Sequence, residues 1–495
     1  MLHFFKESGY EILMSSIYII NFLIILNLIF REKKSIETIV AWTTVLTILP
    51  AFGILLFILV GRGIAKNNMF KIKEKEDKVL KENIANCQKQ LWSSCKHDKI
   101  LKRNIDIIYT LTNSNYSHYS NNNSVDIYDK SCDFFESLLN ELRNAKKYIN
   151  IQFYIFKDDN IGNQIIDILI EKAKQGVEVR LLYDAVGSKL LSSKTIAKLR
   201  KHGVKTGSFF PSLLKVINFN LNYRNHRKIV VIDGNVAFLG GNNIGDEYLG
   251  KDPKFGEWRD THLRLTGDCV IDLNIRFILD WRYTTQEELD LSKYFRNSTE
   301  SNSTSGDNSN NNVGVQIVSS GPDITELDEI KYGYIKMMQK SRKYIYIQSP
   351  YLILDRTIID TLKIACLSGV DVRIMIPSKP DHPFVYWASC SYAGELLKFG
   401  AKVYTYGEDA FLHAKTIVID DSICSIGTAN MDIRSFELNF EVNAFIYSKD
   451  ISKKQREIFE NDIKVSKEIT LDSYNSRSNL IKAKEGISRL LSPLL

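Results

Sequence analysis

The most apolar part of the chain lies at its N-terminus, where two long runs carry no charged residue. Residues 12–30 read ILMSSIYIINFLIILNLIF, and residues 38–60 read TIVAWTTVLTILPAFGILLFILV. Each is long enough to cross a bilayer core of about 30 Å as a helix. Neither has the polar face of a soluble surface helix. We therefore expect a transmembrane hairpin over residues 1–62, with spans at about 12–30 and 38–60.

The residues around these runs argue against a cleaved signal peptide and indicate an orientation. The first run is followed by REKKSIE, which is not a small-residue cleavage site. Positive charges outside the two runs outnumber those between them, which predicts that both ends of the chain, and with them the residues that follow the second run, face the cytoplasm. The flanking group is Lys6, Arg62, Lys66, Lys71, Lys73 and Lys75, and the group between is Arg31, Lys33 and Lys34.

Residues 63–125 mix charged positions with apolar positions at helical spacing. This pattern predicts a juxtamembrane helical linker. Three placements fit the pattern: along the membrane surface, against the part of the chain that follows, or in solvent as a connecting helix.

After Asp126 the pattern alternates between strand-like and helix-like segments. YINIQFYIF, IGNQIIDILIEKAKQG and VEVRLLYDAV read as strand, helix and strand, and KYIYIQSPYLIL, RTIIDTLKIACLSG and VDVRIMIPS repeat that order later. Such units form parallel strand pairs, so the sequence predicts an α/β fold with two homologous halves, each a mixed, largely parallel sheet flanked by helices. We place the halves at 126–296 and 314–495, the latter with a C-terminal helix, around a low-complexity linker at 297–313.

Composition narrows the range of partners. The 495 residues carry a net charge of +7 with a pI near 8.7, which suits phosphate-bearing partners such as lipid headgroups or nucleic acid without choosing between them. The seven cysteines are scattered and lack metal-ligand spacing. We therefore expect no disulfide framework, no zinc site and a reducing setting.

The two halves share one motif, spelled HRKIVVIDGNVAFLGGNN and HAKTIVIDDSICSIGTAN. All corresponding members are 187 positions apart. The first copy supplies His226, Lys228, Asp233, Gly240 and Asn243, and the second supplies His413, Lys415, Asp420, Gly427 and Asn430. In a strand, a His and a Lys two positions apart project from the same face, so each pair is expected to point into one shared cleft.

Two histidines on either side of a phosphate can perform phosphoryl transfer without a cofactor. One attacks phosphorus through a free Nε2 to form a phosphohistidine, and the other exchanges protons with the leaving and incoming alcohols. Lys228, Lys415, Asn243 and Asn430 are expected to donate to the non-bridging oxygens, the electrostatic task that a metal performs elsewhere. We expect neither a metal nor a cofactor.

Other polar residues complete the expected site. Asp260 in WRDTHLRL and Glu441 in NFEVNAFIY stand at equivalent places and are candidates for fixing the histidine tautomers. The motif carboxylates Asp233 and Asp420 belong with the histidines and lysines to the expected catalytic motif, and within it they are expected to hydrogen-bond nearby backbone or side chains.

These residues resemble the phospholipase D superfamily, whose signature HxK(x)4D(x)6GSxN occurs twice. The signature serine is replaced by Gly241 in the first copy, which removes a hydroxyl, and by Thr428 in the second, which is expected to keep a substrate contact. Within the superfamily, the apolar N-terminus, IQSPYLILD and GTANMDIRSFELNFEVN are similar to bacterial cardiolipin synthases. That resemblance implies two phospholipase D-like halves, a phosphatidyl transfer between two phosphatidylglycerol molecules that yields cardiolipin and glycerol, and His226 as the nucleophile with His413 as general acid and base.

Several alternatives stay open. The same residues serve a phospholipase D hydrolase, or a transferase with another alcohol acceptor. The apolar runs disfavour a nuclease, so we expect lipid and membrane partners and no nucleic acid, whereas the oligomeric state is not predicted. The first half also carries about ten extra residues before its histidine, because Gly203 to His226 is 23 residues and Gly400 to His413 is 13. This insertion, 209–222, is either a loop at the membrane interface or a helix packed on the sheet.

Overall fold

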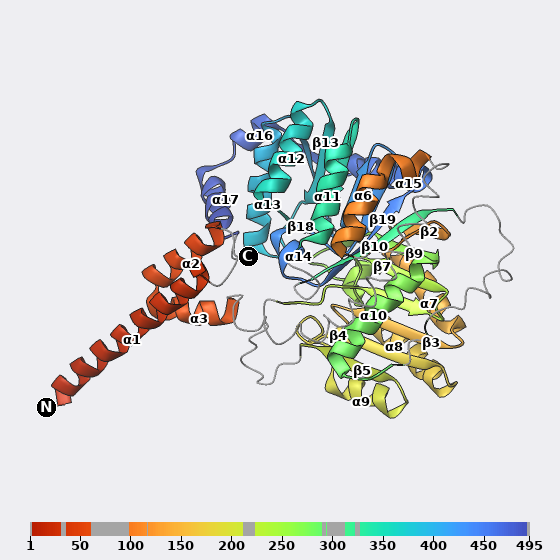
Figure 1. The fold of residues 1–495 in the computed structure, drawn as a ribbon, viewed down its shortest axis with the longest axis horizontal. Coiled ribbons are helices and arrows are strands. Elements are labelled where there is room, and N and C mark those ends of the chain that lie inside the picture. The colour runs from red at the N-terminus through yellow and green to blue at the C-terminus, as the bar shows by residue number, and fades with distance from the viewer. Residues whose placement is uncertain are drawn as a thin grey trace.

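The computed structural model describes residues 2–30, 36–60, 99–115, 117–210, 223–289, 294, 312–321 and 327–492. Most of the predicted insertion at 209–222, nearly all of the predicted linker at 297–313 and the predicted juxtamembrane linker as far as residue 98 lie outside the described residues. In Figure 1, the N-terminal helices extend from one side of a body that is built on two sheets.

The N-terminal apolar region forms a long helix, α1 (Leu2–Phe30), and two short ones, α2 (Ile36–Ile48) and α3 (Pro50–Val60). Within α1, Glu11–Phe30 is long and apolar enough to cross a membrane, the one such helix among the described residues. The prediction of one continuous helix over 38–60 is wrong. It breaks before Pro50, whose ring cannot donate a backbone hydrogen bond and clashes with the preceding turn.

Seven strands form the first sheet, in the order β2-β9-β7-β6-β3-β4-β5. The β3-β4-β5 segment is parallel, and the remaining pairs are antiparallel. The strands are β2 (Asn123–Tyr128), β3 (Tyr148–Phe153), β4 (Glu178–Asp184), β5 (Lys205–Phe209), β6 (Ile229–Ile232), β7 (Val236–Gly240) and β9 (His262–Gly267). The helices in this part of the chain are α7 (Ser131–Asn144), α8 (Asn160–Lys174), α9 (Ser193–Lys201), the 3-10 turn η1 (Asp246–Leu249) and α10 (Cys269–Thr285).

The second sheet has nine strands, in the order β1-β10-β19-β17-β16-β11-β13-β14-β20. Its inner seven repeat the order of the first sheet, again with one parallel segment, β11-β13-β14. The strands are β1 (Tyr119–Ser120), β10 (Gly314–Ser320), β11 (Tyr344–Gln348), β13 (Asp371–Pro377), β14 (Lys402–Tyr406), β16 (Thr416–Ile419), β17 (Ile423–Gly427), β19 (Glu441–Tyr447) and β20 (Lys467–Ile469). The mixed α/β prediction is confirmed.

Helices cover the second sheet as well. They are α6 (Lys99–Asn115), α11 (Glu329–Lys340), α12 (Arg356–Leu367), α13 (Pro383–Leu397), α14 (Ile433–Glu437), α15 (Lys449–Lys464), α16 (Leu471–Asn475) and α17 (Asn479–Leu491). Although α6 and β1 precede the first half in sequence, α6 packs on α11 and β10, and β1 pairs with β10. The stretch predicted as a linker therefore contributes its last part to the second sheet.

The two sheets share one buried core. Val231 and Leu263 of the first sheet belong to the same cluster as Val418 and Val442 of the second, together with side chains of α10 and α15. A second cluster lies between the first sheet and its helices. A third lies between the second sheet and its helices. Burial of so much apolar surface between the sheets fixes how the two motifs are placed relative to each other.

Candidate functional site

Each His-x-Lys motif is held in place by backbone bonds to the other half of the chain. The sequence predicted that the His-x-Lys residues lie on strands, but the structure places them just before β6 and β16. The His226 amide donates to Phe440 O at 3.0 Å, and the His413 amide donates to Arg259 O at 2.7 Å. The second contact continues a short parallel pair, β8 (Glu257–Arg259) with β15 (Ala410–Leu412). The packing of the two halves therefore sets the position of both histidines.

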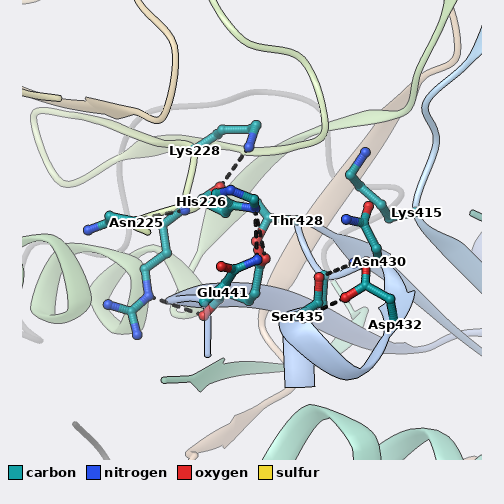
Figure 2. Close-up of polar contacts among 12 residues, drawn as sticks. Asn225, His226, Lys228, Lys415, Thr428, Asn430, Asp432, Ser435 and Glu441 are labelled. Atoms are coloured by element: carbon teal, nitrogen blue, oxygen red, sulfur yellow. Dashed lines mark hydrogen bonds and ion pairs between the residues drawn. The ribbon is translucent and has the colours of Figure 1, made fainter. Parts of the chain in front are cut away.

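The two histidines are oriented by carboxylates in a crossed arrangement. His226 Nδ1 lies 3.1 Å from Glu441 Oε1, and His413 Nδ1 lies 2.7 Å from Asp260 Oδ2. Each carboxylate belongs to the half opposite to its histidine, and both carboxylate side chains have no exposed surface. The Nδ1–H that His413 donates to Asp260 leaves Nε2 as the free nitrogen of that ring, whereas the carboxylate oxygens of Glu441 lie close to His226 but accept no hydrogen bond from the described residues. Figure 2 shows His226 above Glu441, with Lys415 and Asn430 to the right of this pair.

The lysines are buried beside their histidines. Lys228 Nζ donates to the carbonyl of His226 at 2.7 Å, and Lys415 Nζ lies 2.9 Å from His413 Nδ1. Burial lowers the pKa of Lys228 to about 8 and the pKa of Lys415 to about 7. The cation of Lys228 also lowers the pKa of Lys415, so the two motifs share one electrostatic field. An anionic phosphate would relieve this repulsion between the cations.

The partners of His413 also set its charge. Burial, followed by the cation of Lys415, lowers the pKa of His413 to about 4, which leaves the free imidazole neutral at pH 7. Burial would raise the pKa of Asp260, but Lys415 and His413 outweigh that effect and lower it. Asp260 therefore stays ionised and accepts the proton on Nδ1.

The motif carboxylates Asp233 and Asp420 point away from the histidines and anchor the sheets. Asp233 accepts backbone N–H bonds from Lys146, Lys147 and Tyr148, at 2.7, 2.7 and 2.9 Å. Asp420 accepts the equivalent bonds from residues 342–344 at 2.9 to 3.0 Å. Both occupy left-handed backbone positions, at φ of 55° and 51°, which Asp tolerates in a turn. Their bonds are the structural contacts that the sequence led us to expect.

The expected phosphate donors differ in how free they are. The Asn243 amide is engaged, because Oδ1 accepts from Ile155 N at 3.1 Å and Nδ2 donates to Tyr248 Oη at 3.1 Å. By contrast, the side-chain amide of Asn430 makes no hydrogen bond to the described residues, so its Nδ2 is free to donate, and its Oδ1 is buried without a partner among them. In Figure 2, Asn430 lies next to Lys415.

The two departures from the signature have different structural consequences. The hydroxyl of Thr428 is buried and accepts from Val442 N at 2.9 Å, so the expected substrate contact from this residue is not supported. At Gly241, a Cβ would lie 1.9 Å from Asp260 Oδ1. The glycine therefore makes room for the carboxylate that orients His413.

Sequence reasoning missed three residues that contact the histidines. The ring centroid of Tyr154 lies 4.2 Å from that of His226, and that of Trp258 lies 5.0 Å from that of His413. Asn439 Nδ2 lies 3.2 Å from His226 Nδ1. Tyr154 directly follows β3 and Trp258 lies two residues before Asp260, so the strand-end position of the first and the spacing of the second are the available signals.

Two His-x-Lys motifs, two crossed carboxylates and buried lysines define a class of protein, the phospholipase D-like phosphodiester-transfer enzymes. The sequence matches the family described as "Cardiolipin synthase, PLD-like domain" over residues 138–252 and 334–463. It is 48% identical over 485 residues to a cardiolipin synthase of Staphylococcus aureus strain Mu50, covering 97% of this chain and 95% of that protein. The chain belongs to the cardiolipin synthase family.

Two further comparisons agree with this membership. The chain is 46% identical over 489 residues to the major cardiolipin synthase ClsA of Bacillus subtilis strain 168, covering 98% of this chain and 99% of that protein. Its fold is similar to the crystal structure of phosphatidylserine synthase from Haemophilus influenzae Rd KW20, with a TM-score of 0.59 and 16% sequence identity. That similarity covers 79% of this chain and 99% of the other, and it concerns the fold alone.

Proposed function

We propose that the chain is a membrane-bound phosphatidyltransferase that makes cardiolipin and glycerol from two phosphatidylglycerol molecules. The observation that carries the proposal is the pair of histidines, each with Nδ1 within 3.1 Å of a buried carboxylate of the opposite half and with a lysine beside it. Family membership supplies the choice of substrate. Exchange of one phosphodiester for another conserves the bond type, so the reaction requires no nucleotide.

The proposed reaction has two steps with His226 as nucleophile. In the first, His226 Nε2 attacks phosphorus of one phosphatidylglycerol, the bond from phosphorus to the glycerol oxygen breaks, and His413 gives that oxygen a proton. In the second, His413 takes a proton from a glycerol hydroxyl of another phosphatidylglycerol, whose oxygen attacks phosphorus and releases His226. The products are cardiolipin and free glycerol, and both histidines return to their starting states.

The lysines and Asn430 are proposed to stabilise the charge that builds on the non-bridging oxygens. Lys228 and Lys415 supply positive charge in a buried site, where hydrogen bonds to charged groups are strongest. The phosphate would also raise the pKa of His413, because its negative charge offsets the cation of Lys415. That shift supplies the protonated His413 required for the first step.

One observation favours a second candidate, in which the histidines exchange roles. The lowered pKa of His413 makes its free imidazole neutral, as attack on phosphorus requires. Trapping with phosphatidylglycerol labelled in its phosphatidyl group distinguishes the two. Label retained on His413→Ala and absent from His226→Ala supports His226 as nucleophile, and the opposite pattern supports the exchange.

Separation of the lipid products tests the proposed function itself. The purified full chain in phosphatidylglycerol vesicles should release cardiolipin and glycerol in equal amounts, and the double variant His226→Ala/His413→Ala should release neither. Phosphatidic acid as the dominant product would instead identify a hydrolase. A mixed phosphatidyl ester formed preferentially with an added alcohol would identify a different acceptor.

We also propose that the catalytic domain faces the cytoplasm. The five basic residues that follow Val60 closely support this orientation, since basic residues near membrane helices are retained on the cytoplasmic side. The repeated strand order of the two sheets supports the predicted duplication of a phospholipase D-like half. In that arrangement, each copy of the half contributes one histidine and one carboxylate to the site.

A further inference from the structure

The last described helix, α17, exposes three large apolar side chains and buries two polar ones. Leu480, Ile487 and Leu490 are 66%, 56% and 75% exposed. Their spacing places them on one stripe of the helix. Glu485 and Ser488, on the opposite face, are only 3% and 2% exposed. A helix at a water-facing surface has the reverse arrangement, so water is an unfavourable environment for this stripe.

Polar contacts fix the rotation of α17. The guanidinium of Arg477 donates to both carboxylate oxygens of Glu485, with Nε at 2.9 Å from each and Nη2 at 2.6 Å from Oε2. Near the end of the helix, Ser492 Oγ and Tyr392 Oη of α13 lie 3.0 Å apart. Rotating α17 to bury its apolar stripe would break these buried contacts. The outward stripe is therefore built into the packing.

Basic residues lie beside the stripe. Lys482 and Lys484 stand on either side of it, and both are exposed. Long basic side chains that flank an apolar stripe suit a helix lying in the interface of an anionic bilayer. In Figure 1, α17 lies on the side of the body from which the N-terminal helices extend, so the helix is on the side nearer to α1.

We propose that the outward stripe of α17 lies in the interfacial layer of the same bilayer that holds α1, with Lys482 and Lys484 at the headgroups of anionic lipids. Such a helix buries its apolar face about 5–10 Å into the boundary between headgroups and acyl chains. Together with α1, this second attachment holds the body against the membrane surface, and it does not depend on the chemistry of the site. Occupation of the stripe by protein, such as a second copy of the chain, would contradict this proposal.

Tryptophan fluorescence of the full chain tests this docking. Ile487→Trp and a matched variant on α12, Ile364→Trp, both replace exposed isoleucines, 56% and 63% exposed. Each is reconstituted in vesicles of phosphatidylcholine and phosphatidylserine, with and without lipids brominated near the headgroup end of the acyl chains. The emission that each variant adds to wild type is compared.

Emission added at position 487 should be quenched at least twofold by the brominated lipids, and emission added at 364 should be unchanged. Equal quenching at both positions would overturn the proposal. Unquenched, red-shifted emission at 487 would show a water-exposed stripe, and unquenched, blue-shifted emission would show a protein occupant. Either result also overturns it.

A separate observation concerns how the N-terminal region enters the membrane. The rings of Trp42 and Phe57 lie 5.0 Å apart, so α3 folds back beside α2. At Gly53, a Cβ would lie 3.0 Å from Val45 O, which shows that the two backbones are in close contact. With 13 and 11 residues, the helices are only about 20 and 17 Å long, too short for a core of about 30 Å.

A side chain of α1 donates hydrogen bonds to backbone carbonyls at the break between α2 and α3. Asn21 Nδ2 donates to Leu46 O at 3.0 Å and to Pro50 O at 3.2 Å. Backbone carbonyls freed at a helix break require such partners in an apolar environment. Asn21 itself is 4% exposed, in the middle of the segment able to cross the membrane. The tip of the α2–α3 hairpin is therefore stabilised at membrane depth.

We infer that α2 and α3 form a hairpin that enters and leaves the membrane on one face, so that only α1 crosses it. Basic residues then divide eight to one, with Arg31, Lys33, Lys34 and the five that follow Val60 on the catalytic side and Lys6 on the other. Two crossings would divide the same residues six to three. The positive-inside rule favours the first arrangement, which places the N-terminus on the face opposite to the catalytic domain.

Epitope tags at the two ends of the full chain test this topology. In sealed membrane vesicles of known orientation, protease should remove the N-terminal tag only from the face opposite to the one at which it removes the C-terminal tag. Removal of both tags from the same face would demonstrate two crossings and overturn the inference. Detergent-opened vesicles, in which both tags must be cleaved, are the control.

Discussion

Replacing Asp260 by Asn is the sharpest test of the crossed carboxylates, because it changes charge with almost no change in shape. Asp260 Oδ1 accepts from Thr261 N at 2.8 Å, and Oδ2 accepts the Nδ1 proton of His413 at 2.7 Å. In the variant, the amide oxygen keeps the bond to Thr261, and the amide NH₂ then faces His413. The imidazole must accept at Nδ1 and carry its proton on Nε2, which is the nitrogen needed for proton transfer.

The size of the effect follows from that tautomer change and from the lost charge. Asp260 raises the pKa of both His413 and Lys415, so its removal also disfavours the imidazolium that forms during transfer. In enzymes whose histidine is oriented by a buried aspartate, the same substitution lowers turnover about 10⁴-fold. We expect a loss of about 10³ to 10⁴ in kcat, which corresponds to about 4 to 5.5 kcal/mol of transition-state stabilisation.

The assay measures cardiolipin formation from phosphatidylglycerol by the full chain in vesicles of fixed composition. Asp167→Asn is the matched control, because that aspartate lies on α8 with its side chain 67% exposed and pairs with Lys198 on the surface. It should retain activity within about twofold, since exposed ion pairs contribute little. A folded Asp260→Asn protein that loses less than about tenfold in kcat would refute the orienting role of the carboxylate.

Three further results are expected. Gly241→Ala should lower kcat about 10²-fold, because its Cβ displaces Asp260. The control Gly407→Ala should stay close to wild type, because its Cβ would meet nothing nearer than 3.6 Å, and equal activities of the two variants would contradict the steric argument. The value of kcat/KM should fall as pH rises through about 7 to 8, because Lys415 and Lys228 lose their protons there. The variant Lys415→Arg keeps its charge and should shift that fall to higher pH, and an unchanged profile would exclude Lys415 as the source of the fall. Asp420→Asn should lower the free energy of unfolding by about 3 kcal/mol, measured by denaturant titration, because an amide NH₂ then opposes one of the backbone donors; a loss below about 1 kcal/mol would show that this anchor is dispensable.

The sequence by itself determined those features that depend on local spacing. The apolar run at 12–30 lacks a polar face, so it specifies a membrane helix before any tertiary contact forms. The alternation of strand-like and helix-like segments specified a mixed α/β fold in the same way, because period and length fix each element. The doubled His-x-Lys motif indicated the class of chemistry, since a shift of 187 positions for every member is a repeat of the whole unit. Pro50 was also present in the sequence as a reason to break the second apolar run.

Only the tertiary structure decided which groups meet across the two halves. Residues 260 and 441 were identifiable as carboxylates, yet their crossed pairing with His413 and His226 depends on how two sheets pack around one core. The burial of Thr428 and the need for glycine at 241 have the same origin, because each is set by a neighbour that is distant in sequence. Local periodicity does not predict long-range packing, because the pattern of residues within a few positions does not depend on which distant residues they contact.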